Sequence, residues 1–146
     1  MIDLSRYVGL PYASGGRGPE AFDCWGLARM VYADLLGLAL PALDGTEPLA
    51  PEVHGWPAAP GPQLIDVAHW PGAGARSGGG HCGIYAGGGL VLHAHAAHGA
   101  ALLSRLGGLT TPSKPVWWRR VCETNAQPGS GSPANRVRAG CGGARA

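Results

Sequence analysis

The chain has 146 residues, with 26 glycines, 13 prolines, 45% hydrophobic residues and only 14% charged residues. A glycine and proline content near roughly 25–30% borders on low complexity, but the apolar and weakly charged composition is that of a globular chain, and this length suits one domain. The net charge of +2 is too small for a surface that follows phosphates, so we expect no nucleic-acid partner.

The basic excess lies at the C-terminal end. Residues 1–122 hold eight basic and eight acidic side chains, and the last 24 residues carry the surplus of arginine. No run approaches the roughly 18–20 apolar residues that span a bilayer, and the first six residues include an acidic side chain and lack the apolar segment of an export signal. We therefore expect a chain made without its own export signal and without membrane insertion.

The N-terminal part of the chain predicts two helices separated by a loop. Apolar residues indicate a short helix over 2–10, and the glycine-rich stretch 14–19 indicates a loop. The clearest helix follows: Asp23 is a good N-cap, apolar side chains at 27, 31 and 35 share one face, and Gly37 stands where a C-cap would. Cys24 then falls in the first turn of this helix.

The rest of the chain predicts strands. Seven prolines exclude a long helix from 41–71, which we interpret as a proline-rich surface insertion. Strand-like runs lie at 64–70, 81–86, 90–94, 101–104 and 116–121. One helix followed by strands predicts an α+β fold with an antiparallel sheet. Residues 123–146 lack periodicity, so we expect a domain over 1–122 and a low-complexity tail over 123–146, disordered or docked on a partner.

Cys24 is the first candidate for chemistry. A thiol in the first turn of a helix faces the positive end of the helix dipole and unpaired backbone amides, which favour the thiolate. The alternative is a small, unreactive core residue, because buried cysteines are common. The four cysteines, at 24, 82, 122 and 141, are too few and too far apart for a disulfide framework, and no CxxC pair suggests a zinc ribbon.

A cysteine nucleophile needs a base and usually a third group that orients the base. His81 and His93 lie on two adjacent strand candidates joined by three glycines at 87–89. A three-residue loop pairs Gly83 with His93 and places His81, His93 and His95 on one face, whereas a two-residue loop sends His93 to the opposite face. Three glycines favour the longer loop. Taken alone, either histidine is also explained as a surface residue or a hydrogen-bonded core residue.

Histidines at 93, 95 and 98 have a spacing that can share a divalent ion. No carboxylate or second cysteine lies nearby in the sequence as an obvious fourth ligand, so we expect neither a metal nor a cofactor. His54 and His69 lie in or beside the proline-rich stretch and are interpreted as incidental.

Five ordered motifs carry a resemblance to a known family. They are YVGLPY at 7–12, GG at 15–16, FDCWGL at 22–27, HCGIY at 81–85 and VLHA at 91–94. Together they resemble the NlpC-type cell-wall cysteine peptidases, most closely the branch that tailed bacteriophages and gene-transfer particles encode as a tail peptidase. That family carries a DC(S/W)G motif at a helix start, an H-x-G-I-Y strand and a third polar residue, often histidine, twelve positions after the first histidine. The resemblance covers residues 7–121.

The resemblance implies a compact papain-like α+β fold in which N-terminal helices pack on a small antiparallel sheet. It implies Cys24 as nucleophile, His81 as general base and His93 as the residue that orients the imidazole. Tyr12 matches a motif tyrosine that lies beside the nucleophile in the family, and Asp23 belongs to the same motif as Cys24. Backbone amides at the helix start, that of Cys24 included, could form the oxyanion hole.

The same resemblance implies a substrate and a place of action. The expected substrate is a peptidoglycan stem peptide, typically cut at the D-glutamyl–diaminopimelate bond through a Cys24 thioester. The expected partners are phage-tail tip or hub proteins. The expected location is a virion tail or tail-like particle that acts at the bacterial cell wall after cytoplasmic synthesis. The alternative is a non-catalytic tail assembly module on the same fold.

The chain departs from the family pattern at one turn. The family usually has Pro-Gly-Asp before the first strand, whereas this chain has Leu-Ile-Asp at 64–66. The turn is therefore expected to be altered, although Asp66 remains.

Overall fold

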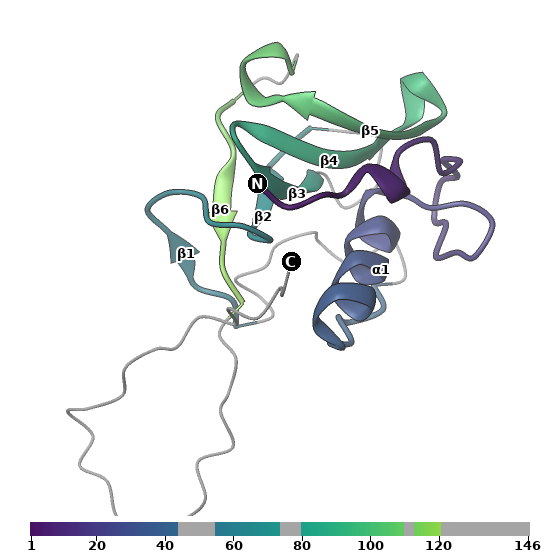
Figure 1. The fold of residues 1–146 in the computed structure, drawn as a ribbon, viewed down its shortest axis with the longest axis horizontal. Coiled ribbons are helices and arrows are strands. Elements are labelled where there is room, and N and C mark those ends of the chain that lie inside the picture. Colours follow the sequence, from purple (N-terminus) through teal and green to yellow (C-terminus); the bar gives the residue numbers. More distant parts are fainter. Residues whose placement is uncertain (44–54, 74–79, 110–112, 121–146) are drawn as a thin grey trace, which may run out of the picture.

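The part of the chain that the structure describes forms one α-helix and one six-stranded antiparallel sheet (Figure 1). The computed structural model describes residues 1–43, 55–73, 80–109 and 113–120. Helix α1 spans Cys24–Leu36, and the strands are β1 (Ala58–Ala59), β2 (Val67–Trp70), β3 (His81–Gly87), β4 (Leu90–His95), β5 (Ala100–Arg105) and β6 (Val116–Trp118), in the order β1-β6-β2-β3-β4-β5. The predicted α+β class is confirmed. No helix in the described ranges has the length and apolar character that a bilayer crossing requires.

Helix α1 begins and ends where the sequence predicted. Asp23 is its N-cap, and Oδ1 of Asp23 accepts a hydrogen bond of 2.7 Å from the Gly26 amide. Gly37 ends the helix in the left-handed conformation, with φ 64°. Leu27 and Val31 on the predicted apolar face are buried. Because α1 begins directly after Asp23, the first helical side chain is that of the candidate nucleophile.

The predicted helix over 2–10 is wrong. The structure has a 3₁₀ turn, η1, at Ser5–Tyr7. The backbone on both sides of this turn bonds to the sheet: the Ile2 amide donates to a β3 carbonyl at 2.8 Å, and the Gly9 amide donates to a β5 carbonyl at 2.9 Å. A continuous helix would turn these amides away from the strands, so the long-range hydrogen bonds exclude it.

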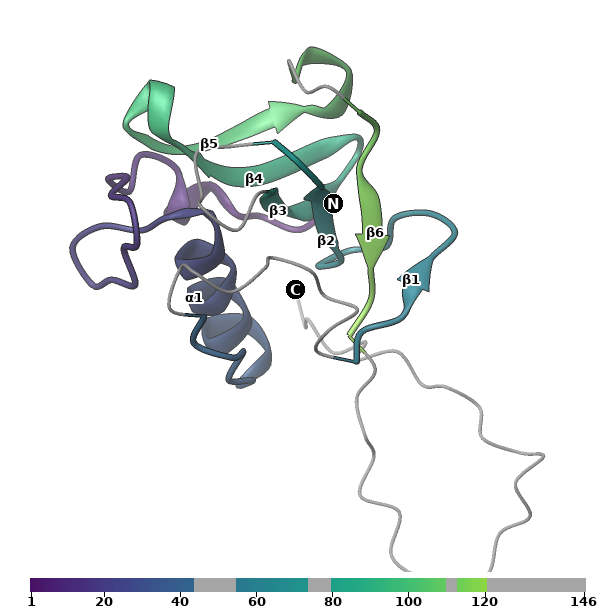
Figure 2. The same cartoon turned by 180° about the vertical axis from the view of Figure 1, so that it is seen from behind.

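The two faces of the sheet are covered differently. Helix α1 packs against β3 and β4 on one face, where alternate side chains join the main hydrophobic core: Cys82, Ile84, Leu92 and Ala94. The opposite face carries a smaller cluster that includes Trp70 and Val91, with Tyr85 and Trp117 packed against it. Figure 2 shows the same arrangement from behind. Because strand side chains alternate between faces, those of His81 and His93 belong to this second face.

The five predicted strands correspond to β2–β6, with shifted ends. The first begins at Val67 because the preceding residues form a turn, in which the Asp66 amide donates to the Gln63 carbonyl at 3.0 Å. The last ends at Trp118. The predicted tail over 123–146, and with it the boundary at 122, lies outside the described residues.

The turn before β2 contains the departure from the family pattern. Ile65 has φ 72°, a left-handed conformation that β-branched residues rarely adopt. The Tyr32 hydroxyl donates to the Ile65 carbonyl at 2.7 Å, and the Ile65 side chain is buried. Asp66 accepts a bond from the Gln63 amide and pairs with Arg119 through both carboxylate oxygens, at 3.1 and 2.7 Å. The segment before β2 therefore forms a tight turn, at a conformational cost of about 1–2 kcal/mol at Ile65, and the expected alteration relative to the family stays a prediction.

The interpretation of 41–71 as a surface insertion is wrong for part of this stretch. Trp56 is buried and its ring lies 6.5 Å from that of Trp25 and 5.7 Å from that of Tyr32, both on α1. The short strand β1, which was not predicted, pairs with β6 at the edge of the sheet. Trp56 is therefore part of the apolar cover of α1 and not a surface residue. Residues 44–54 lie outside the described part.

Candidate active site

Cys24 is the first residue of α1, and only 5% of it is exposed. Its thiol has a pKa well below the usual value. The largest cause is a hydrogen bond with the Cys82 side chain; a hydrogen bond with His81, the positive charge of His81 and the Cys82 backbone add to it, against the opposing effect of burial. A position at a helix N-terminus favours the same charged form. The environment of Cys24 therefore stabilises the thiolate.

His81 is the first residue of β3 and is held from two sides. It pairs with Trp70 of β2, and the indole and imidazole rings stack with centroids 5.7 Å apart at 29°. Its Nε2 atom lies 2.9 Å from Nδ1 of His93. Since Nε2 is engaged by His93, Nδ1 is the ring nitrogen that remains for Cys24. The imidazole is thus oriented before any substrate binds.

His93 lies buried in β4 and connects His81 to β5. Its Nε2 atom lies 2.9 Å from Oγ of Ser104. Burial, with a smaller effect from the charges of neighbouring histidines, lowers the pKa of His93 to about 3. Its imidazole is therefore neutral near neutral pH, so one ring nitrogen donates and the other accepts. Cys24, His81, His93 and Ser104 form what we call the hydrogen-bonded row.

The β3–β4 hairpin has the register that brings the two histidines together. Ile84 pairs with Leu92, which is the register predicted for a three-residue loop and puts both histidines on one face. The loop itself differs from the prediction, because Gly87 pairs with Leu90 and leaves two residues, 88–89, in the turn. A bulge just before Gly87 adds the extra residue that restores the register. The predicted face is confirmed, whereas the predicted loop length is wrong.

Two glycines allow close approach of the segments around the site. A Cβ atom added to Gly83 of β3 would lie 2.7 Å from the Leu92 carbonyl oxygen and 3.1 Å from Cβ of His93. A Cβ atom added to Gly26 of α1 would lie 2.1 Å from the Gly16 carbonyl oxygen. Any larger residue would push β4 away from β3, or the preceding loop away from α1. The glycines of the HCGIY and DCWG motifs therefore have a packing role.

Asp23, predicted as a supporting residue, fixes the start of α1. One carboxylate oxygen caps the helix, and the other lies 2.6 Å from Nη1 of Arg17. Arg17 also donates to the carbonyls of Gly16 and Leu43, and the Asp23 amide donates to the Gly16 carbonyl at 3.0 Å. These bonds tie the helix start to the loop before it, and so determine where the Cys24 side chain lies.

Tyr12, the other supporting residue, lies in the segment before α1. Its backbone pairs with Phe22, two residues before Cys24, and its amide donates to the Gly99 carbonyl at 2.8 Å. Its side chain is half-buried against the main core. The structure thus brings the Tyr12 backbone next to the nucleophile's own segment, and a role for its side chain stays a prediction.

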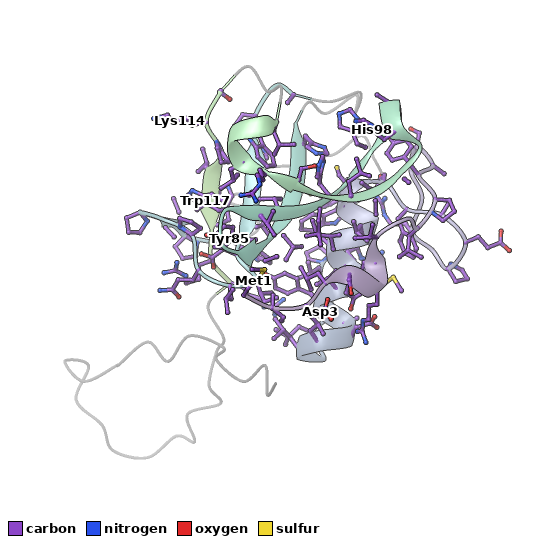
Figure 3. The ribbon with its side chains drawn as sticks, turned by 45° about the horizontal axis from the view of Figure 1, so that its top comes forward. Met1, Asp3, Tyr85, His98, Lys114 and Trp117 are labelled. Carbon is purple, nitrogen blue, oxygen red and sulfur yellow. The ribbon has the colours of Figure 1, made fainter. Side chains whose placement is uncertain are left out.

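His95 and His98 extend the cluster of imidazoles along β4. The His95 ring centroid lies 5.8 Å from those of His81 and His93, and 5.3 Å from that of His98. Figure 3 shows His98 near the β4–β5 connection, away from Trp117. Burial lowers the pKa of His95, and the charges of His81 and His98 add to the effect. Among the described residues, no group of three or more His, Cys, Asp or Glu side chains is placed to hold a metal ion.

Sequence reasoning missed three contributors to this site. Ser104 was predicted to lie in a strand but was not assigned to the site. It lies two residues after Leu102, which is opposite His93, so strand alternation places its side chain on the same face as that of His93. Trp70 stacks on His81 only because of the β2–β3 register, for which the sequence holds no local signal. Cys82 was considered only for disulfides and metals. The contacts of Ser104 and Trp70 depend on how strands align, and that of Cys82 depends on how α1 packs against β3.

His69 and His54 were interpreted as incidental. His69 is buried in β2, where its Nδ1 atom accepts a hydrogen bond of 3.3 Å from the Trp118 indole. His54 lies outside the described residues.

Comparisons with known proteins indicate the family of this chain. A sequence model of the NlpC/P60 family matches residues 9–124. The chain is 35% identical over 96 residues to a probable endopeptidase of Corynebacterium glutamicum, covering 64% of this chain and 41% of that protein. It is 34% identical over 94 residues to the gamma-DL-glutamyl hydrolase of Bacillus subtilis, covering 63% and 22%. Its fold is similar to the NlpC/p60 domain of the peptidoglycan hydrolase SagA, with a TM-score of 0.55 at 23% identity, over 78% of this chain and 89% of that one.

These likenesses differ in extent. The matched region spans less than half the length of the two relatives compared by sequence, whereas the fold likeness covers most of the SagA domain. The NlpC-type fold predicted from the motifs is confirmed by that likeness. Because the family's sequence model covers most of the chain, this chain belongs to the NlpC/P60 family.

Proposed function

We propose that this chain is a cysteine peptidase that hydrolyses peptidoglycan stem peptides. The observation that carries the proposal is the hydrogen-bonded row, in which Cys24 interacts with His81 and His81 lies 2.9 Å from His93. A thiolate beside an oriented imidazole is what covalent acyl transfer requires. Relatives named as an endopeptidase and a hydrolase support the same reaction class.

In the first half of the proposed reaction, the Cys24 sulfur attacks the carbonyl carbon of the scissile amide and a C–S bond forms. Backbone amides at the start of α1 donate hydrogen bonds to the resulting oxyanion. His81 gives a proton from Nδ1 to the leaving nitrogen as the C–N bond breaks. The products of this half are a free amine and a Cys24 thioester.

In the second half, a water molecule attacks the thioester carbonyl while His81 takes up its proton. The C–S bond then breaks, which releases a carboxylic acid and restores the thiolate. The low pKa of His93 keeps that residue neutral throughout. His81 is therefore the group that changes charge, and His93 orients it.

The substrate class is proposed from the relatives and the motif resemblance. One relative is a gamma-DL-glutamyl hydrolase, and the similar solved domain comes from a peptidoglycan hydrolase. We propose that the scissile bond is the D-glutamyl–diaminopimelate bond of the stem peptide, because it is a glutamyl bond and it lies in peptidoglycan.

We further propose that the chain works in a phage-type tail or tail-like particle and reaches the cell wall with it. The support is the likeness of the motifs at 7–12, 22–27 and 81–85 to the tail-peptidase branch. The proposed partners are tail tip or hub proteins. Mass spectrometry of purified particles should find this chain in a fixed ratio to other tail proteins, and its absence from such particles would contradict the tail context alone.

Digestion of defined muropeptides by the full chain, followed by mass spectrometry, tests the proposed reaction. We expect a new fragment with a free diaminopimelate amine, abolished by Cys24→Ala. His98→Gln is the matched control, since it removes an exposed imidazole near the site and should leave cleavage intact. Continued hydrolysis by the Cys24→Ala variant would contradict the mechanism. No hydrolysis by the unsubstituted chain, together with no labelling of Cys24 by a thiol-reactive probe, would favour the non-catalytic module.

A further inference from the structure

The hydrogen-bonded row ends at Ser104 of β5. Its Oγ atom lies 2.9 Å from Nε2 of His93, and the residue is half-buried. The β4–β5 pairing places Leu102 opposite His93 and Ser104 opposite Val91. Residues two apart on a strand share a face, and diagonal neighbours on that face are within reach of each other. Ser104 therefore meets the side of the imidazole that faces away from His81.

The Ser104 hydroxyl can donate or accept a hydrogen bond, so it can serve either neutral form of the His93 ring. When Nε2–H of His93 donates to Ser104, Nδ1 of His93 accepts from Nε2–H of His81. His81 can then carry hydrogens on both ring nitrogens while it faces the Cys24 thiolate. In the other tautomer, Nδ1–H of His93 points at Nε2 of His81, so His81 cannot hold its second proton there.

We propose that Ser104 is a positioning residue that accepts the Nε2–H hydrogen bond of His93 when Nδ1 of His93 accepts from His81, and so supports the state in which His81 carries the proton of Cys24. Ser104 acts through His93 and does not contact the reacting atoms. The catalytic meaning of this inference rests on the proposed function, whereas the hydrogen-bonding pattern itself requires no peptide cleavage.

Burial and the charges around His93 keep its ring neutral. The titratable groups that influence it are three imidazoles, His81 on β3, His95 on β4 and His98 in the following 3₁₀ turn (Ala96–His98). Positive charge on any of them disfavours a second proton on His93. His93 therefore stays neutral, and Ser104 hydrogen-bonds a ring that has one donor and one acceptor nitrogen.

The first test compares Ser104→Ala with Ser104→Thr, which keeps the hydroxyl. Alkylation of Cys24 by iodoacetamide is followed as a function of pH by mass spectrometry of the Cys24 peptide. Loss of one hydrogen bond should move the alkylation midpoint of the alanine variant up by about half a unit to one unit. Its kcat/KM on muropeptides should fall by about 5- to 100-fold. The threonine variant should restore both values.

The second test uses the unsubstituted chain and does not depend on how the variants fold. Nitrogen-15 NMR of labelled histidine should show His93 protonated at Nε2 and unprotonated at Nδ1. A hydrogen on Nδ1, or an unchanged alkylation midpoint in Ser104→Ala, would overturn the inference. If the tautomer and the midpoint shift are found but no stem peptide is cut, the proposed function fails while the role of Ser104 stands.

Discussion

Replacing Asp23 tests whether the start of α1 positions the Cys24 thiol. The Asp23 carboxylate makes two bonds, one of 2.7 Å from the Gly26 amide and one of 2.6 Å with Arg17. Asp23→Ala removes both bonds, whereas Asp23→Asn keeps a capping oxygen and removes the charge. A comparison of the two variants therefore separates the cap from the ion pair.

The size of the effect follows from burial and from the partners that remain. Loss of an N-cap costs about 1 kcal/mol. Asp23 is 2% exposed, but the Arg17 side chain is 22% exposed and keeps two carbonyl partners. The unpaired guanidinium should therefore cost less than the roughly 3–5 kcal/mol of a fully buried broken pair. We expect a loss of about 2–4 kcal/mol for Asp23→Ala and about 1–3 kcal/mol for Asp23→Asn.

Urea unfolding followed by tryptophan fluorescence measures these losses, and the rate of Cys24 alkylation at neutral pH measures the effect on the site. Both variants should react more slowly than the unsubstituted chain, Asp23→Ala the more so. The matched control is Asp34→Asn, because Asp34 is on α1, pairs with Arg6 at 3.3 Å and has a side chain that is 38% exposed. Asparagine keeps an oxygen for the Tyr7 hydroxyl, which donates to Oδ2 of Asp34 at 3.1 Å. That control should cost no more than about 1 kcal/mol. Equal losses for Asp23→Asn and Asp34→Asn would refute the reasoning.

Three further substitutions test the packing and charges of the site. Gly26→Ala should destabilise the protein by about 1–3 kcal/mol in urea unfolding despite the better helix propensity of alanine, because the new Cβ would lie 2.1 Å from the Gly16 carbonyl oxygen; a gain in stability would contradict this packing. Cys82→Ala removes the largest influence that lowers the pKa of Cys24, so the alkylation midpoint of Cys24 should rise, and an unchanged midpoint would assign the low pKa to other groups. Burial lowers the pKa of His93 from 6.5 to about 3. Between pH 6.5 and about 3, His93 binds a proton in the unfolded chain but not in the folded chain. The contribution of His93 to the free energy of unfolding is therefore fully present above pH 6.5, and it falls with decreasing pH by up to about 1.4 kcal/mol per pH unit. His93→Asn should flatten that fall in urea titrations at several pH values, and equal slopes in the two proteins would exclude His93 as its source.

Features that depend on neighbouring residues could be predicted from the sequence alone. The start of α1 at Cys24 and its end before Gly37 follow from capping, which is a contact within a few residues of chain. The strands could be located from short apolar runs bounded by glycine and proline. The motif resemblance also singled out His81 and His93 correctly as neighbours, since the structure joins them at 2.9 Å.

Features that depend on how distant segments align could be seen only in the folded protein. The apolar pattern over 2–10 suits a helix, but hydrogen bonds to β3 and β5 hold the backbone in another conformation. The β3–β4 bulge, the stacking of Trp70 and the bond to Ser104 all come from strand register. The register describes how one strand is aligned with its neighbour. The alternation of apolar and polar side chains along a single strand is the same whatever that alignment is, so it does not reveal the register. For this reason the sequence could name Cys24 and the two histidines as candidates, whereas the residues that contact them in the fold became visible only in the folded sheet.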